Sequence, residues 1–272
     1  MHTVLSADGT RIAYDRSGSG PALVYVTGAL CDRSTDKPLA ALLAPYFTVL
    51  TYDRRGRGDS GDTAPYQVER EVEDLAAVIA EAGGSASVYG MSSGAALALH
   101  AAAQGVAITR LALFEPPYSP DDEERLTQAR AYAARLGELL TAGRRGDAVE
   151  LFMTTVGLPA ELIGQMRGAP MWPALEALAP TLAYDAAVMG NSALPAELVA
   201  QVGVPALVAD GGASPAWLRD TARRLAGALP QGRHRTLAGQ THDVDPQALA
   251  PVLREFLSDP APARPPSAVK IR

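Results

Sequence analysis

The sequence predicts an α/β fold built on a mostly parallel, doubly wound β-sheet. Short β-rich runs alternate with helical runs through most of the chain, the pattern of strands joined by crossover helices. Some β-rich runs are continuously apolar, as expected of strands buried on both faces. With 272 residues, the chain is also long enough to bury a large core without disulfide or metal support.

The first expected strand, residues 10–15, alternates apolar and polar side chains after the turn signal Asp8-Gly9. The run at 21–26 is uniformly apolar and predicts a central strand. Further strands are expected at 47–52, 87–89, 108–114, 204–209 and 233–237.

Helices are expected between these strands. Residues 68–82 carry one apolar stripe and end at a pair of glycines. Residues 95–103 are rich in Ala and Leu with little polar surface, which predicts a buried helix. Two more helices, at 215–229 and 246–257, begin with a proline, which is favourable in the first helical turn.

Residues 119–200 interrupt the alternation and contain no convincing strand. Helical runs are expected there at 121–141, 147–156 and 174–188. We therefore expect a helical cap inserted into an α/β core formed by residues 1–118 and 201–258. The Pro- and Ala-rich end, residues 259–272, is expected to be disordered.

Composition narrows the classes of partner and site. The chain has 24 Lys and Arg against 30 Asp and Glu, a net charge of −6, and no basic stripe, which argues against nucleic acid as a partner. The single Cys31 excludes a disulfide framework, and four scattered histidines leave little basis for a metal site. No targeting segment and no apolar run of about 20 residues is visible, so a cytoplasmic protein without a membrane partner is expected.

The sharpest local signal is a G-x-S-x-G motif at residues 90–94, between an expected strand and an expected helix. In this setting the motif forms a tight bend that raises the Ser92 hydroxyl above the edge of the sheet. The bend also sets Ser92 at a helix N-terminus, where backbone N–H groups favour developing negative charge. The same pattern arises by chance in Gly- and Ser-rich chains, and its flanking strand and helix are what favour Ser92 as a nucleophile.

With this motif, the chain resembles the α/β-hydrolase fold family from about residue 10 to residue 257, outside the cap. Four segments match the family in order: the loop after an early strand, a D-x-R-G-x-G-x-S stretch, the serine motif and a late histidine loop. They lie at 25–29, 52–60, 90–94 and 239–242. The histidine that the family usually carries before Gly28 is Thr27 here. The charged residues at 53–59 are expected to form a structural turn held by Arg–Asp pairs.

A serine hydroxyl is a weak nucleophile at neutral pH and needs a base. His242 is the candidate, because imidazole titrates near neutrality and this residue lies where the resemblance places the base. The other histidines are less suited. His2 is terminal, His234 lies within an expected strand, and His100 lies in an apolar helix, where a hydrogen-bonded core histidine is expected.

The acid that would orient His242 is where the sequence departs from the family, because Ser214 stands in the usual acid position. Two carboxylates at the expected carboxyl ends of strands remain, Glu115 and Asp210. The resemblance favours Glu115, since some members, haloalkane dehalogenases among them, carry their acid at that place. Structural alternatives stay open: a cap or salt-bridge role for Glu115, a turn role for Asp210, and a site without an acid.

The resemblance implies an oxyanion hole made by the backbone N–H groups of Ala29 and Ser93. Gly28, Leu30 and Met91 are expected to line the substrate site beside them.

The expected function is hydrolysis of a small or medium apolar ester or lactone through an acyl-enzyme on Ser92. Carbon–carbon bond hydrolysis uses the same residues and stays open. A second class also stays open, a non-hydrolytic or ligand-binding member, since Ser214 replaces the usual acid. Serine at position 92 argues against epoxide hydrolase and dehalogenase activity, because the members of this family with those activities use an aspartate nucleophile there. No cofactor or metal is expected; the partner is a small-molecule substrate, and the chain is expected to be a monomer or homodimer.

Overall fold

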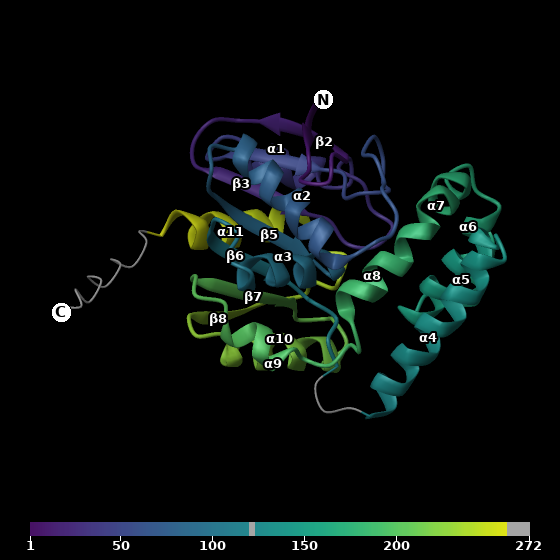
Figure 1. The fold of residues 1–272 in the computed structure, drawn as a ribbon. Coiled ribbons are helices and arrows are strands. Elements are labelled where there is room, and N and C mark those ends of the chain that lie inside the picture. The colour runs from purple at the N-terminus through teal and green to yellow at the C-terminus, as the bar shows by residue number, and fades with distance from the viewer. Residues whose placement is uncertain (120–122, 260–272) are drawn as a thin grey trace, which may run out of the picture.

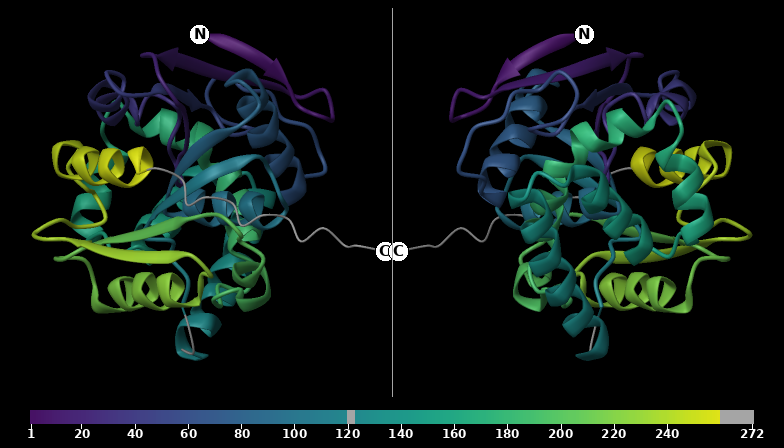
Figure 2. Two further views of the ribbon diagram at one scale, coloured as in Figure 1. Left: turned by 90° about the vertical axis from the view of Figure 1, so that its left-hand side faces the viewer. Right: turned by 90° about the vertical axis from the view of Figure 1, so that its right-hand side faces the viewer.

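An eight-stranded sheet with the strand order β1-β2-β4-β3-β5-β6-β7-β8 forms the centre of the protein (Figure 1). The computed structural model describes residues 1–119 and 123–259. The strands are β1 (His2–Leu5), β2 (Arg11–Ser17), β3 (Ala22–Val26), β4 (Thr48–Tyr52), β5 (Ala86–Met91), β6 (Ile108–Phe114), β7 (Ala206–Gly211) and β8 (Gly232–Leu237). Strand β2 pairs antiparallel with β1 and β4, and all other neighbours are parallel. The predicted mostly parallel sheet is confirmed. Figure 2 shows the β1–β2 pair at one edge and β7–β8 at the other.

Helices cover both faces of the sheet. Helices α1 (Lys37–Leu43) and α11 (Pro246–Ser258) pack together in one apolar cluster. The opposite face carries α2 (Val68–Glu81), α3 (Ser93–Ala103), α9 (Ala196–Ala200) and α10 (Ala216–Ala228). Four short elements were not predicted from the sequence: β1, which is mostly exposed, α1, α6 (Ala160–Arg167) and α9.

The helical insertion has an apolar cluster of its own. Its elements are α4 (Glu123–Thr141), α5 (Arg145–Thr155), α6 (Ala160–Arg167), α7 (Trp172–Leu178), the 3₁₀ turn η1 (Ala179–Thr181) and α8 (Leu182–Met189). The single helix expected at 174–188 was wrong, because η1, which contains Pro180, separates α7 from α8. By contrast, α9 packs in the cluster of the sheet face, through Val199.

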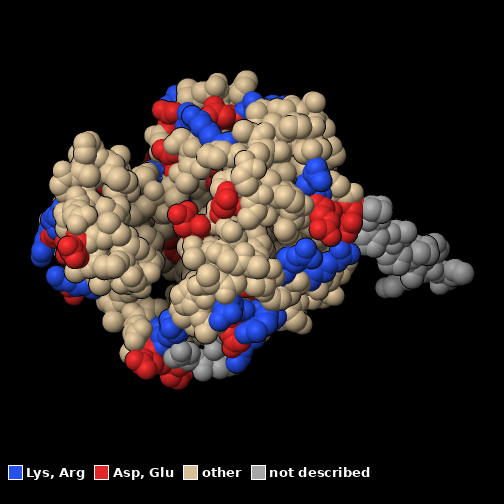
Figure 3. Space-filling view, turned by 180° about the vertical axis from the view of Figure 1, so that it is seen from behind, with Lys and Arg blue, Asp and Glu red and all other residues tan. Residues whose placement is uncertain are grey.

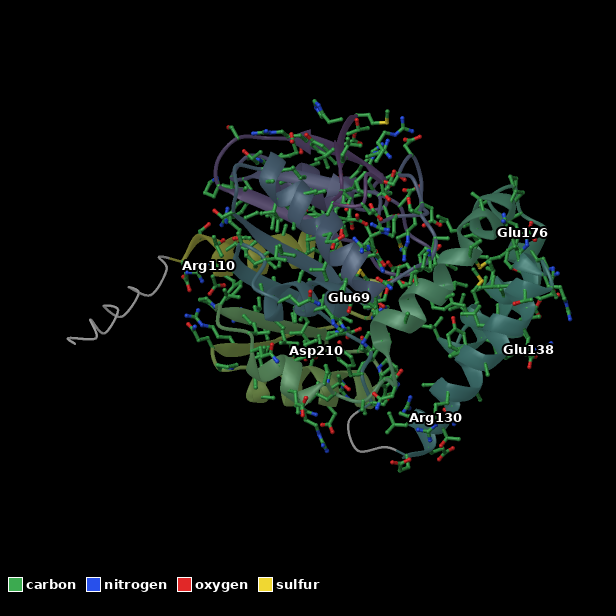
Figure 4. The ribbon with its side chains drawn as sticks, viewed as in Figure 1. Glu69, Arg110, Arg130, Glu138, Glu176 and Asp210 are labelled. Carbon is green, nitrogen blue, oxygen red and sulfur yellow. The ribbon has the colours of Figure 1, made fainter. Side chains whose placement is uncertain are left out.

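Figure 1 shows α4–α8 standing together beside the sheet, and Figure 3 shows a groove between this lobe and the rest of the surface. Helices α4 and α7 carry Glu138 and Glu176 on this lobe, away from Asp210 in the sheet (Figure 4). Within residues 1–119 and 123–259, no helix is both long and apolar enough to cross a bilayer. The tail expected to be disordered lies, from residue 260 onward, outside the described residues.

Candidate active site

Ser92 occupies the sharp turn between β5 and α3. Its backbone has φ 56° and ψ −127°, a conformation that side-chain-bearing residues rarely adopt outside functional sites. The Ser92 N–H donates to the Phe114 carbonyl oxygen at the end of β6, over 2.9 Å. On the other side, a Cβ built on Gly28 would lie 3.1 Å from the Ser92 Cβ. Backbone from both neighbouring strands therefore holds the serine in place.

The two glycines of the motif are required by close backbone contacts. A Cβ on Gly90 would lie 2.7 Å from the Ala95 Cα, and a Cβ on Gly94 would lie 2.2 Å from the Val26 carbonyl oxygen. Neither contact involves a flexible side chain that might move aside, so the bend needs glycine at both positions.

Replacing Gly94 with alanine is expected to lower the free energy of unfolding by about 3 kcal/mol, because the new methyl group displaces backbone at the end of β3. Urea unfolding of the two proteins measures the change. Gly227→Ala in α10 is the matched control, since a Cβ there meets nothing within 4 Å, and it is expected to leave stability unchanged or higher. Equal effects of both substitutions would contradict the requirement for glycine at position 94.

Glu115 and His242 form the hydrogen-bonded pair of the site. The fully buried Glu115 follows β6, and its Oε2 lies 2.7 Å from the His242 Nδ1. Its Oε1 accepts a hydrogen bond from the Gly211 N–H, over 2.8 Å. This carboxylate orients the ring, and a proton on Nδ1 leaves Nε2 free to accept another.

Ser92 and Glu115 follow the carboxyl ends of two neighbouring parallel strands, β5 and β6. The residue that precedes Glu115, Phe114, bonds the Ser92 N–H, and its ring centroid lies 6.5 Å from that of His242. The Ser92 hydroxyl itself has no hydrogen-bond partner among residues 1–119 and 123–259. Contacts between nucleophile and base are often long in an unliganded enzyme and shorten when substrate binds.

The Glu115 carboxyl has a pKa below its ordinary value. Burial raises this pKa, but the hydrogen bond with His242, the nearby Ser214 hydroxyl and the Gly211 N–H together outweigh burial. Ser214, which stands in the family's usual acid position, is buried and faces the carboxylate without a hydrogen bond of ordinary geometry. Glu115 is therefore ionised at neutral pH.

This lowered pKa predicts a pH-dependent contribution to stability. Because the folded pKa of Glu115 lies below its unfolded value of about 4.3, the contribution is present above that pH. It is lost as pH falls through the folded pKa. The difference in unfolding free energy between the wild type and Glu115→Gln is thus expected to narrow as pH falls from about 5 to about 3. Urea titrations across this range test it, and a difference that does not change with pH would contradict it.

Asp210, the second candidate acid, contacts a different histidine. It lies inside β7 and is fully buried, and its Oδ2 lies 2.5 Å from the His234 Nε2 and 3.3 Å from the Thr236 Oγ1. The sequence placed Asp210 just past the end of its strand, whereas β7 continues to Gly211. Its side chain therefore faces the neighbouring strand β8, and the structure pairs His242 with Glu115 instead.

One predicted oxyanion donor, Ala29, lies on the loop after β3, and the other, Ser93, is the first residue of α3. The backbone N–H groups of Ala29 and Ser93 make no hydrogen bond with another residue in the described ranges. Ala29 and Leu30 also pack against the apolar cluster of the helices α4–α8, and Leu30 has a φ of 54°. Met91, at the end of β5, is partly buried against the apolar cluster that contains α1 and α11.

One buried group at this site, Asp185 on α8, was not predicted from the sequence. Its carboxylate accepts hydrogen bonds from Arg54, Arg57 and the Ser93 hydroxyl. The charged stretch at 53–59 does form Arg–carboxylate pairs, as expected, but the sequence held no signal that Asp185 on α8, more than 120 positions away, completes them.

No group of three or more His, Cys, Asp or Glu side chains in the described residues is arranged to hold a metal ion. The site consists of a serine, a histidine, a carboxylate and backbone N–H groups, a set that supports nucleophilic attack and proton transfer.

Several known proteins with similar sequences or structures are hydrolases. The family model described as "Alpha/beta hydrolase family" matches residues 17–254. The crystal structure of an alpha/beta hydrolase from Sphaerobacter thermophilus is 58% identical, covers 94% of this chain and 99% of that chain, and superimposes with a TM-score of 0.85.

Two curated relatives are similar over a shorter stretch. An uncharacterized hydrolase of Bacillus subtilis, YraK, is 36% identical over 99 residues, which are 35% of this chain and 36% of that protein. The zearalenone hydrolase of Cladophialophora bantiana is 34% identical over 104 residues, which are 36% of this chain and 39% of that protein. The matched stretches thus span less than half of either relative. From the family match and the near full-length similarity to the Sphaerobacter protein, we conclude that this chain belongs to the alpha/beta hydrolase family.

Proposed function

We propose that this protein is a serine hydrolase that cleaves a carboxylic ester or lactone through an acyl-enzyme on Ser92. The observation that carries the proposal is the strained bend that presents Ser92 at the end of β5, together with a His242 ring held by the buried Glu115 carboxylate after the neighbouring strand β6. These are the three roles that acyl transfer requires: a nucleophile, a base and a group that orients the base.

In the first half-reaction, the Ser92 Oγ attacks the substrate carbonyl carbon while the His242 Nε2 takes the hydroxyl proton. The ionised Glu115 stabilises the imidazolium that forms. The backbone N–H groups of Ala29 and Ser93 receive the negative charge that develops on the carbonyl oxygen. When the tetrahedral intermediate collapses, His242 returns its proton to the departing alkoxide, which leaves as an alcohol.

In the second half-reaction, His242 removes a proton from water, which attacks the Ser92 ester. The carbonyl oxygen again takes negative charge, and as the intermediate collapses His242 gives its proton to the Ser92 Oγ, which restores the serine hydroxyl and releases the carboxylic acid. A lactone follows the same steps, except that its alcohol stays attached to the acyl group and the product is one hydroxy acid.

The surroundings of the oxyanion loop favour an apolar substrate. Ala29 and Leu30 pack against the cap, together with partly buried apolar side chains of α4 and α6, Tyr132, Leu140 and Met166. A cap of this kind encloses a small or medium acyl group and excludes water from the reacting atoms.

The test is a panel of p-nitrophenyl esters of increasing acyl length, together with five- to fourteen-membered lactones, assayed on purified protein. Saturable turnover of at least one ester or lactone is expected, and Ser92→Ala protein purified in the same way controls for contaminating esterases. Turnover of a vinylogous diketone without turnover of esters or lactones would assign carbon–carbon bond hydrolysis instead. No turnover of any of them by folded protein would favour a ligand-binding member of the family.

A further inference from the structure

Asp185 is a buried carboxylate of the cap that makes four short contacts with the core. Its Oδ1 accepts hydrogen bonds from the Arg54 Nη1 at 2.7 Å, the Arg57 Nη2 at 2.8 Å and the Ser93 Oγ at 2.7 Å. Its Oδ2 lies 2.9 Å from the same Arg57 nitrogen. Only 8% of the Asp185 side chain is exposed, and both guanidinium groups are almost entirely buried.

The partners of Asp185 reach both segments that carry the oxyanion donors, the loop after β3 and the start of α3. The Arg57 Nη1 donates to the carbonyl oxygens of Gly28 and Cys31, which lie on either side of Ala29 and Leu30. Arg54 donates to the Thr27 carbonyl, over 3.3 Å. One carboxylate therefore holds the loop after β3 through two arginines, and the first residue of α3 directly through its hydroxyl.

These contacts determine which way the N–H groups point. In a planar trans peptide, the carbonyl oxygen and the following N–H point in opposite directions. Because Arg57 holds the Gly28 carbonyl, the Ala29 N–H must point away from Arg57. The bond from the Ser93 hydroxyl to Asp185 likewise restrains the residue whose N–H is the second donor.

The charges of this cluster depend on Asp185. Burial raises the pKa of the Asp185 carboxyl, but Arg57, Arg54 and the Ser93 hydroxyl lower it by more than burial raises it. The carboxyl is therefore ionised. Arg54 has a second carboxylate partner, Glu71, at 2.6 and 2.7 Å. Within the described ranges, Arg57 forms its ion pair with Asp185. Without Asp185, the buried Arg57 would have to reorient, and the loop that it holds would lose its restraint.

We propose that Asp185 is a positioning residue, which sets the Ala29 and Ser93 N–H groups toward the substrate carbonyl and so couples docking of the cap to assembly of the oxyanion hole. This inference rests on the proposed function for its catalytic consequence, although the restraint on the two loops can be measured without it.

The kinetic test compares Asp185→Asn with Asp74→Asn. Asp74 is the matched control, because it is a buried carboxylate with two hydrogen bonds to Arg55 in the same charged stretch, at 2.8 and 2.7 Å, and does not touch the oxyanion loop. On the best p-nitrophenyl ester, Asp185→Asn is expected to lower kcat by about 10- to 100-fold with KM changed less than about 3-fold. Asp74→Asn is expected to keep kcat within about 2-fold even where it lowers the Tm. A folded Asp185→Asn protein with wild-type kcat, or equal losses in both variants, would overturn the proposal.

A second readout does not depend on activity. Amide hydrogen exchange of peptides that cover residues 27–33 and 92–95 is expected to be at least about 10-fold faster in Asp185→Asn than in the wild type, and unchanged in Asp74→Asn. Unchanged exchange in Asp185→Asn would overturn the proposal whether or not the wild type hydrolyses esters. An inactive wild type with the expected exchange pattern would instead refute the proposed function alone.

Should Asp185→Asn fail to fold, Ser93→Ala tests the direct contact, because it removes the hydroxyl and keeps the backbone N–H. It is expected to lower kcat by about 3- to 10-fold and to raise exchange at 92–95. Wild-type kcat and exchange in that variant would overturn the proposal.

Discussion

Replacement of Ser92 by alanine is expected to lower kcat for ester or lactone hydrolysis by about 10⁶-fold, to the level of residual catalysis by the remaining site. Without the hydroxyl no acyl-enzyme forms. Water would then have to attack the substrate directly, and it is not held in position as the Ser92 hydroxyl is. The measurement is steady-state hydrolysis by the two proteins on the best substrate of the panel.

The matched control for this substitution is Ser87→Ala, at the other end of the same strand. The Ser87 hydroxyl contacts the Thr109 hydroxyl at 3.1 Å and lies at the start of β5, whereas Ser92 follows its end. Ser87→Ala is expected to keep kcat within about 2-fold. Turnover by Ser92→Ala close to that of the wild type would assign the nucleophile elsewhere.

The second large effect is expected for Glu115→Gln, at about 10⁴-fold in kcat. Glutamine keeps the size of the side chain but cannot stabilise the imidazolium, and its amide group can favour the wrong tautomer of His242. The loss should appear in kcat and kcat/KM together, because the interaction strengthens in the transition state.

Asp210→Asn is the control for that experiment, since Asp210 is an equally buried carboxylate that contacts a histidine, His234. It is expected to keep kcat within a few-fold of wild type, although it lowers stability. If both variants hydrolyse substrate at the wild-type rate, the assignment of an acid to this site is wrong. If Asp210→Asn loses turnover and Glu115→Gln keeps it, the two carboxylates have the opposite roles.

Most of the sheet was predictable from the sequence because its strands are short apolar runs between helical segments. The serine bend was predictable for a related reason: its glycines, strand and helix are contiguous in the chain. The elements that were not predicted, β1, α1, α6 and α9, are all short. Their formation depends on pairing and packing with distant segments rather than on a strong local pattern.

The residues themselves did not decide between Glu115 and Asp210, and only the resemblance to the family favoured Glu115. Both follow apolar residues of a predicted strand, and the sequence does not show where each strand ends. In the structure, β6 ends one residue before Glu115, whereas β7 includes Asp210. That difference directs one carboxylate to the His242 loop and the other to His234 on β8.

Asp185 could not be predicted from the sequence for a different reason. Its partners Arg54 and Arg57 belong to a motif that the sequence does reveal, but Asp185 itself is one acidic residue in a helix of the insertion. Only the packing of α8 against the core brings it to the arginines. Contacts made across such a separation leave no periodicity or spacing in the chain.

The most direct test of the central claim, an activated Ser92, is the intact mass of the protein after treatment with a fluorophosphonate probe, followed by peptide mapping. We expect one adduct per wild-type chain, located on Ser92, and none on Ser92→Ala. An adduct that persists on Ser92→Ala, or a folded wild-type protein that takes up no probe, would contradict the account.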